Sequence, residues 1–262
     1  MLDMKPNNTD INDRRIIVSL TSFPRRIGVV WHTIESLFRQ TLKPDKIILW
    51  LSNNQFSSFN DLPKELQAQT ERGLEIRFVD GDFRSHKKYL YAFREFPHDY
   101  VVLVDDDILY PSNFINQLMD GMSATRVHCS YGSIMTFDKL GKLQPYVMWK
   151  HLVKDKSENG CFFFGSGGGT VLVPSALYKD VCDIELVTYL CPTADDVWLN
   201  AMCRLAKLKI VKVRGELIFP IYIKNNQTLC STNINESYND VQIKSIRNYY
   251  IEQKGVDPFV KN

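Results

Sequence analysis

The stretch Tyr100-Val101-Val102-Leu103-Val104-Asp105-Asp106-Asp107 decides the fold expected for this chain of 262 residues. A short apolar run that ends abruptly in polar residues predicts a buried β-strand. The three adjacent carboxylates repel one another and resist desolvation, so they are costly unless a cation or a set of hydrogen bonds compensates them. A divalent metal ion is the simplest compensation.

In an extended segment, Asp105 and Asp107 project to one side and Asp106 to the other, so the first and third aspartates could share one metal ion or its water shell. Ligation by oxygen alone favours Mg²⁺ or Mn²⁺ over zinc. A competing interpretation is a solvated acidic turn that caps the helix expected near Pro111-Ser112. A phosphatase of the haloacid type fits poorly, because Leu109 stands where that class needs Thr or Val.

Upstream of this stretch, apolar β-rich runs alternate with segments of helical spacing. The expected strands are Ile16–Leu20, Lys46–Leu51 and Leu74–Val79, and the expected helices are Val29–Gln40, Pro63–Arg72 and His86–Phe96. This alternation predicts an α/β fold with a mostly parallel central sheet covered by helices. Ligands of such sheets bind beyond the carboxyl ends of the strands.

The downstream half is less regular. Expected strands are Cys129–Phe137, Gln144–His151, Thr170–Val173 and Lys209–Val213, and expected helices are Thr193–Leu208 and Asp240–Gln253. We find no repeat and no linker that divides the chain, so one domain over residues 1–262 is expected, with a polar tail over 224–262.

Bulk composition excludes several classes of protein. The 32 Lys and Arg nearly balance the 30 Asp and Glu, so no global field favours nucleic acid. The six cysteines lack C-x-x-C or zinc spacing, which favours reduced thiols. Because Met1–Arg15 has no apolar signal region and no run approaches about 18 apolar residues, a cytoplasmic location is expected. A peripheral contact with the inner membrane stays open, since the tail mixes basic and aromatic residues.

A second acidic site lies in Pro192-Thr193-Ala194-Asp195-Asp196-Val197-Trp198, at the start of an expected helix. An acid held there could act as a general base if its surroundings tune its pKa. The alternative is structural, because Thr193 and Asp196 have the spacing of a capping box and acids in a first turn are favoured by the helix dipole.

The segment Gly165-Ser166-Gly167-Gly168-Gly169 permits unusual backbone angles and close approach of a ligand. It has neither the Lys-Ser/Thr of a phosphate-binding P-loop nor the spacing of a dinucleotide-binding loop. A structural turn before the strand that starts at Thr170 is an equally open interpretation.

Taken in order, three segments resemble inverting GT-A glycosyltransferases, especially the family 2-like enzymes that build bacterial capsular and lipopolysaccharide glycans. They are Val18–Arg26, Val104–Asp107 and Asp195–Val197, and the resemblance covers roughly residues 15–213. It implies a GT-A-like, Rossmann-like sheet with a small C-terminal helical tail. Residues of about 15–130 would bind the nucleotide sugar, and about 131–223 would supply the acceptor and catalytic half.

The resemblance also implies a donor site. The positions that would bind the nucleotide sugar are Thr21, Ser22, Phe23, Arg25, Asn53 and Asp80, with Lys87 or Lys88 contacting the diphosphate. Asp105 and Asp107 would hold Mn²⁺ or Mg²⁺ against the diphosphate, and Asp106 would lie nearer the ribose or the outer water ligands of the metal. For the two lysines, a solvated helix face is the competing interpretation.

The expected catalytic base is Asp196, with Asp195 as the next candidate, because a Glu-Asp pair usually stands there in the family. The implied reaction moves a hexosyl or N-acetylhexosaminyl group, with inversion, from a UDP-sugar to a hydroxyl of a glycan or lipid-linked saccharide. One alternative, a sugar-phosphate nucleotidyltransferase, would need a glycine-rich loop where Thr21–Arg26 has no glycine. A non-catalytic glycan-binding protein would not need both acidic sites.

Overall fold

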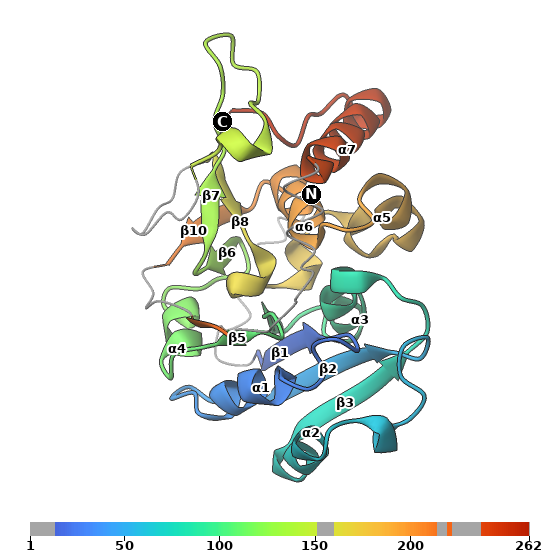
Figure 1. The fold of residues 1–262 in the computed structure, drawn as a ribbon. Helices are drawn as coiled ribbons and strands as arrows, with labels where there is room; N and C mark the ends of the chain where they lie inside the picture. The colour runs from blue at the N-terminus through green and yellow to red at the C-terminus, as the bar shows by residue number, and fades with distance from the viewer. Residues whose placement is uncertain (1–13, 151–159, 214–218, 222–236, 262) are drawn as a thin grey trace, which may run out of the picture.

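A computed structural model describes residues 14–150, 160–213, 219–221 and 237–261 of the chain. Its centre is a seven-stranded sheet with the strand order β10-β6-β9-β4-β1-β2-β3 (Figure 1). The strands are β1 (Ile16–Thr21), β2 (Lys46–Ser52), β3 (Leu74–Val79), β4 (Tyr100–Leu103), β6 (Arg126–Cys129), β9 (Thr170–Leu172) and β10 (Lys209–Lys212). All neighbours pair in parallel except β9, which runs antiparallel to β4 and β6.

Helices and two short ribbons surround this sheet. The α-helices are α1 (Val30–Phe38), α2 (Lys64–Ala68), α3 (Lys87–Glu95), α4 (Phe114–Met119), α5 (Ile184–Leu190), α6 (Asp195–Leu205) and α7 (Tyr238–Lys254). One ribbon pairs β5 (Ile108–Leu109) with β11 (Phe219–Pro220), and the other pairs β7 (Gly132–Ile134) with β8 (Phe162–Phe164). No helix of the described residues is both long and apolar enough to span a membrane.

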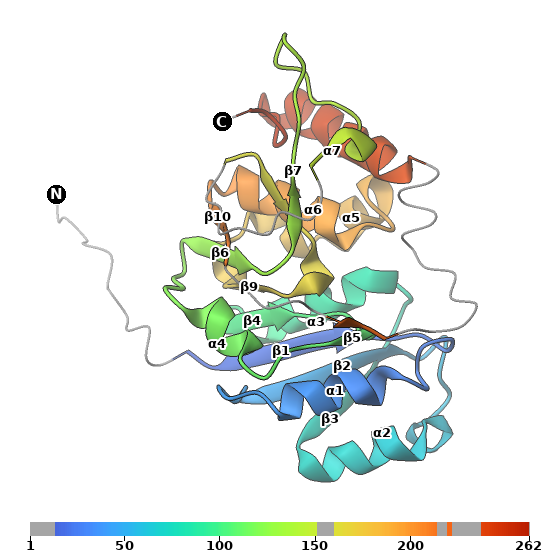
Figure 2. The same cartoon turned by 60° about the vertical axis from the view of Figure 1, so that its left-hand side comes forward.

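Both faces of the sheet are buried because successive residues of each strand point to opposite sides. Ile17 belongs to the core that includes Trp198 of α6 and Tyr250 of α7, whereas its neighbour Val18 belongs to the core under α1 and α4. Figure 2 shows α1 and α2 on one side of β1 and β2 and the α5–α7 layer on the other. The predicted α/β fold with covered faces and a C-terminal helix is confirmed.

Two expected strands of the downstream half are wrong. Cys129–Phe137 is split, because the chain leaves the main sheet after β6 and joins the separate ribbon as β7. Gln144–His151 contains a turn of 3₁₀ helix, η5 (Tyr146–Met148), preceded by Pro145, which cannot donate a ladder hydrogen bond. His151 lies outside the described residues, as does Cys230; the other five cysteines are free thiols.

Candidate active site

The acidic residues and the glycine segment meet at the carboxyl ends of β1 and β4. These two strands are parallel neighbours at the centre of the sheet, so the residues that follow them, Ser22 and Asp105, emerge at the same edge. The antiparallel strand β9 lies next to β4, and the glycine segment that precedes β9 therefore reaches the same edge. Helix α6 contributes its N-terminal acids through contacts with that segment.

Lys88 joins the two acidic sites that lie far apart in the sequence. Its ammonium donates to Oδ1 of Asp105 at 2.9 Å and to Oδ2 of Asp195 at 3.0 Å. The lysine side chain is only 3% exposed, whereas that of Asp105 is 42% exposed and open to a ligand. Burial lowers the pKa of Lys88, but the two carboxylates outweigh it and raise the pKa well above the usual value. Lys88 is therefore a permanent cation held between the sites.

The glycine segment supports Asp105 by close packing. The carbonyl of Gly167 accepts the Asp105 backbone amide at 3.1 Å and also the hydroxyl of Tyr110. A Cβ atom built on Gly167 would lie 1.8 Å from the Asp105 carboxylate, so any other residue there would force that carboxylate to move. Ser166, the preceding residue, donates its hydroxyl to the buried carboxylate of Asp195. The segment thus positions both acids, and it is more than a turn before β9.

Asp106 is the structural member of the aspartate triplet. Its carboxylate is buried and accepts hydrogen bonds from the hydroxyl of Ser22 at 2.6 Å and from Arg26 at 2.8 Å. The same guanidinium nitrogen of Arg26 lies 2.9 Å from Oδ2 of Asp107. Burial raises the pKa of Asp106 despite these partners. Burial and the nearby charge of Asp105 raise the pKa of Asp107 to about 6.

These residues fit a divalent cation on the grounds of charge. The triplet and Asp195 supply four carboxylates, while the cations paired with them are Lys88 and Arg26. The raised pKa of Asp107 shows that its ionised form is under-compensated, and an added metal ion would correct this. Within the described ranges no group of three or more His, Cys, Asp or Glu side chains is arranged around one point. Asp105 and Asp107 would therefore need further oxygen ligands from a substrate or water.

The two aspartates at the start of α6, Asp195 and Asp196, have pKa values shifted in opposite directions. Burial opposes ionisation of Asp195, but Lys88, His86 and the hydrogen bond from Ser166 together outweigh it and lower the pKa of Asp195 to about 2. Burial and the adjacent charge of Asp195 raise the pKa of Asp196 to about 7. Asp195 is thus a fixed anion and Asp196 titrates near neutral pH, where a general base is most effective.

The structural alternative at this helix, a capping box with Thr193 at the N-cap, does not match the helix boundary. The hydroxyl of Thr193 donates to Gln242 of α7 at 3.2 Å, and Ala194 occupies the N-cap position without a side-chain hydrogen bond. Asp196 does accept the backbone amide of Val197 at 2.8 Å. This hydrogen bond in the first turn of α6 stabilises the Asp196 carboxylate. It does not explain why Asp195 is buried in an ion pair with Lys88.

The other positions expected to bind the nucleotide lie along the same edge. Asn53 follows β2, Asp80 follows β3, and the amide of Asn53 donates to the Asp80 carboxylate at 2.8 Å. Thr21 donates its hydroxyl to the carbonyl of Trp50 at 2.8 Å, which fixes the end of β1 against β2. These contacts bring the expected residues of three adjacent strands together.

Three further expected residues have distinct surroundings. Lys87 is buried and paired with Asp82, so neither Lys87 nor Lys88 is part of a solvated helix face. Phe23 lies beneath the guanidinium of Arg26, with 5.5 Å between the guanidinium carbon and the ring centroid. Arg25 is exposed in the turn after β1.

Sequence reasoning singled out the segments that contain Arg26, Ser166 and Gly167 but did not assign these three residues to the site. Arg26 was adjacent to the expected Arg25, and only the turn after β1 decides which arginine faces the aspartates. The contacts of Ser166 and Gly167 join segments separated by 29 and by more than 50 positions, which no local pattern reports.

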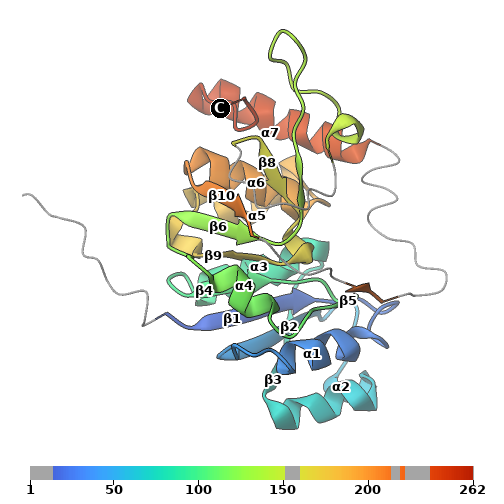
Figure 3. The same ribbon diagram turned by 90° about the vertical axis from the view of Figure 1, so that its left-hand side faces the viewer.

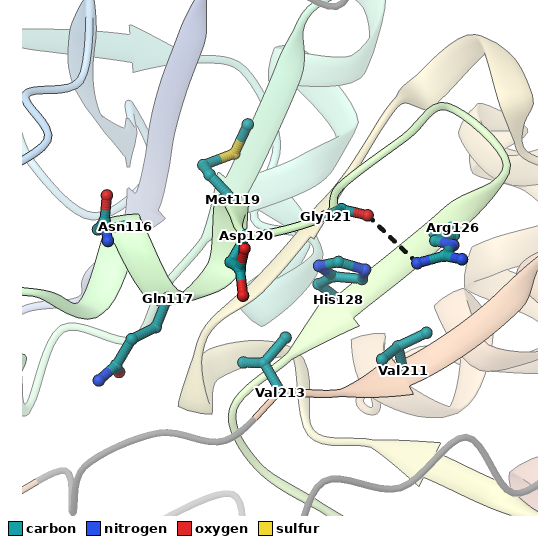
Figure 4. A pocket seen from close by; sticks show the side chains of 9 residues that line it. All are labelled: Asn116, Gln117, Met119, Asp120, Gly121, Arg126, His128, Val211 and Val213. Atoms are coloured by element: carbon teal, nitrogen blue, oxygen red, sulfur yellow. Dashed lines mark hydrogen bonds between the residues drawn. The ribbon is translucent and has the colours of Figure 1, made fainter.

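A cavity of about 500 Å³ lies elsewhere, between α4 and the strands β6 and β10 (Figure 4). Arg126 donates to the carbonyl of Gly121 at its rim, and the ring of His128 bonds to the carbonyl of Leu118. None of the expected site residues lines this cavity. Its volume therefore gives no reason to move the candidate site away from the aspartates.

One family model matches the chain. The family described as Glycosyl transferase family 2 matches residues 22–172, which is more than half of the chain and includes the aspartate triplet and the glycine segment. No curated protein sequence matches the chain.

Two solved structures with similar folds illustrate the architecture. One is S. aureus TarS 1–349 in complex with UDP, with a TM-score of 0.53 and 10% identity, covering 92% of this chain and 66% of that chain. The other is a 4-diphosphocytidyl-2C-methyl-D-erythritol synthase, with a TM-score of 0.50 and 11% identity, covering 82% of this chain and 96% of that chain. At such identities the likeness shows the fold alone.

Proposed function

The chain belongs to glycosyl transferase family 2, and on that premise we propose that it transfers a sugar, with inversion, from a UDP-sugar to a hydroxyl of a glycan or a lipid-linked saccharide. The proposal rests on the opposite pKa shifts of the two aspartates at the start of α6. A buried, ion-paired Asp195 stands beside an Asp196 with a pKa of about 7, at the same edge as an open Asp105.

The donor would lie across the carboxyl ends of β1, β2 and β3. Asn53 and Asp80 offer an amide and a carboxylate to the base and ribose, and the turn containing Ser22 and Arg25 borders the nucleotide. Support for uridine comes from TarS, whose similar fold was solved with UDP. Hexosyl and N-acetylhexosaminyl donors are both compatible with this arrangement.

Asp105 and Asp107 would hold a divalent cation, Mn²⁺ or Mg²⁺, together with diphosphate oxygens. Such a cation supplies charge neutralisation for the leaving diphosphate. Asp106 keeps the triplet in place through Ser22 and Arg26 rather than contacting the ribose directly. Lys88 is buried and contacts both Asp105 and Asp195, so it would act by positioning these acids rather than by contacting the diphosphate.

In the proposed reaction Asp196 accepts the proton of the acceptor hydroxyl. The hydroxyl oxygen then forms a bond to the anomeric carbon, while the bond from that carbon to the diphosphate oxygen breaks and the nucleoside diphosphate leaves with the electron pair. Attack from the face opposite the leaving group inverts the configuration. General-base assistance of this kind contributes about 10²–10⁴-fold to the rate.

The first test is calorimetric binding of UDP and GDP to the purified chain, with Mn²⁺ and again with a chelator. We expect metal-dependent binding of UDP and weaker binding of GDP. Binding of neither nucleotide by a folded sample would contradict the donor site, and tighter binding of GDP would contradict the choice of uridine. Glu185→Gln, which changes an exposed acid on α5, is the matched control and should bind as the unmodified chain does.

A nucleotidyltransferase remains the competing enzyme class, because the synthase named above has a similar fold. That class forms a nucleoside diphosphate sugar from a nucleoside triphosphate and releases pyrophosphate. No residue contact at the site favours it, since Thr21–Arg26 has no glycine to enclose a triphosphate. Incubation with UTP and sugar phosphates should release no pyrophosphate.

A further inference from the structure

A hairpin over residues 135–144, here called the Leu140 hairpin, projects from the end of the molecule that also carries α7 (Figures 2 and 3). Its strands are closed by backbone hydrogen bonds and by the pairing of Phe137 with Leu143. At the tip, the Asp138 carboxylate accepts the backbone amides of Leu140 and Lys142, both at 2.9 Å. The tip is thus a fixed turn.

This turn holds a large apolar side chain in solvent. Leu140 is 94% exposed, and Val147 and Met148 of the adjoining η5 are 54% and 59% exposed. The hydroxyl of Thr136 donates to the carbonyl of Met148 at 3.1 Å, so η5 is attached to the side of the hairpin. A single exposed leucine is ordinary, but exposed apolar side chains at both the hairpin tip and the attached η5 indicate a contact surface.

The charge around these residues is positive. Lys139 and Lys142 flank Leu140, and Lys150 follows η5; all three are exposed. The only acidic residue between positions 135 and 150 is Asp138, whose carboxylate already accepts two backbone amides. Lysines on both sides of a protruding leucine match a surface that is anionic outside and apolar beneath.

Helix α7 extends this surface. The backbone amide of Tyr146 donates to the Asp240 carboxylate at 2.8 Å, which joins the hairpin segment to the start of α7. The helix buries Ile246 and Tyr250 against the core and leaves an outward row exposed, with Val241, Lys244 and Ile251 at helical spacing. Lys254, the last residue of α7, is exposed, as is the acid Glu252, and the exposed residues Val256, Val260 and Lys261 follow the helix.

We propose that the Leu140 hairpin, η5 and the outward row of α7 form a docking surface for an anionic lipid membrane. Leu140 and Met148 would enter the headgroup region, and the lysines would lie at the lipid phosphates. A lipid surface fits better than a protein partner, because the apolar side chains are separated by lysines and do not form one continuous apolar patch.

A molecule docked on the membrane in this way would have the acidic pair of α6 connected to the membrane-facing helix α7. Gln242 of α7 accepts the backbone amide of Thr193 at 2.9 Å, so the helix that would lie on the membrane also contacts the segment before Asp195. This part of the inference, that a docked molecule meets a lipid-linked acceptor, rests on the proposed function. Membrane binding itself does not, and the two fail separately.

The test is co-sedimentation of the full chain with vesicles of phosphatidylcholine alone and of phosphatidylcholine mixed with phosphatidylglycerol. We expect binding only to the mixed vesicles, with loss as the salt concentration rises well above about 0.15 M. Lys139→Gln with Lys142→Gln should weaken binding by about 25-fold, at about fivefold per lysine. Leu140→Ser should also weaken it, and because this side chain is exposed the variant should fold normally.

Matched controls are Lys43→Gln with Lys64→Gln, which remove two exposed lysines near the α2 side of the sheet, and Phe59→Ser, which removes an exposed ring there. Both should bind vesicles as the unmodified chain does. Equal binding to both vesicle types, no binding, or unchanged binding of the hairpin variants would overturn the proposal. So would a dimer in lipid-free solution that Leu140→Ser dissociates, since the surface would then belong to a second copy. Metal-dependent UDP binding by all variants is measured in parallel and reports on the donor site alone.

Discussion

The ammonium of Lys88 lies 3.0 Å from Oδ2 of Asp195 in a buried ion pair. The lysine belongs to the helix after β3 and the aspartate to the start of α6, and the same ammonium reaches Asp105 after β4. Removing one member of a buried pair leaves an uncompensated charge, which is far more costly than the pair is stabilising. The contact therefore contributes both to the stability of the fold and to the positions of Asp105 and Asp195 in the site.

Replacement of Lys88 by Met should lower the free energy of unfolding by about 3–5 kcal/mol, because Asp195 would remain buried without its cation. Urea denaturation measures this loss. In the double variant Lys88→Met, Asp195→Asn, part of the stability should return, since no unpaired charge remains. Lys64→Met, at an exposed position, should change stability by no more than about 0.5 kcal/mol. Purely additive effects of the two substitutions would contradict the coupling.

Asp196→Asn should lower kcat by about 10²–10⁴-fold while leaving UDP binding nearly unchanged, because the carboxylate is needed only to accept the proton. Initial-rate measurements of transfer and calorimetry of UDP separate these effects. Near-normal turnover in this variant would assign the base elsewhere. Asp195→Asn should instead reduce stability as well as turnover, since it leaves Lys88 with one partner fewer.

The rate at low substrate concentration should fall as the pH drops through about 7, because Asp196 has a pKa of about 7 and acts only when ionised. The neighbouring charge of Asp195 contributes to that raised value. In Asp195→Asn, the acidic limb of the pH profile should therefore move to lower pH even where the rate is reduced. A limb that stays in place would show that Asp195 does not set the basicity of its neighbour.

Gly167→Ala should abolish metal-dependent UDP binding, because the new Cβ atom would lie 1.8 Å from the Asp105 carboxylate and displace it. Gly28→Ala is the matched control, as a Cβ atom there meets nothing within 4 Å. Circular dichroism establishes that both variants are folded, and calorimetry compares their affinities. Unchanged affinity in Gly167→Ala would separate Asp105 from the donor site.

Asp107→Asn should remove the metal dependence of UDP binding, since it deletes one of two expected metal ligands without changing the shape of the side chain. Titration with Mn²⁺ at fixed UDP is the measurement. Asp106→Asn should act differently: it weakens the contacts of Ser22 and Arg26, and its main effect should be on thermal stability. Retained metal dependence in Asp107→Asn would exclude it as a ligand.

Local sequence patterns were enough to predict the upstream half of the fold. Periodicity located β1, β2, β3 and β4 and the helices α1 and α3 within about two residues, because each is a local amphipathic or apolar pattern that the parallel sheet then buries on both faces. The expected helix Pro63–Arg72 is α-helical only as far as Ala68 and continues as a 3₁₀ helix. It also identified the two acidic segments, since adjacent carboxylates after an apolar run need compensation wherever the chain folds.

The contacts of those acids depend on the three-dimensional fold. The pairing of Lys88 with both Asp105 and Asp195, the choice of Arg26 over Arg25, and the fit of Gly167 against Asp105 all join segments distant in sequence. The chain's change from the main sheet to the β7–β8 ribbon was missed for the same reason. Local patterns report which side chains are buried, whereas pKa values and ion pairs depend on which distant groups the fold brings within about 3 Å of one another.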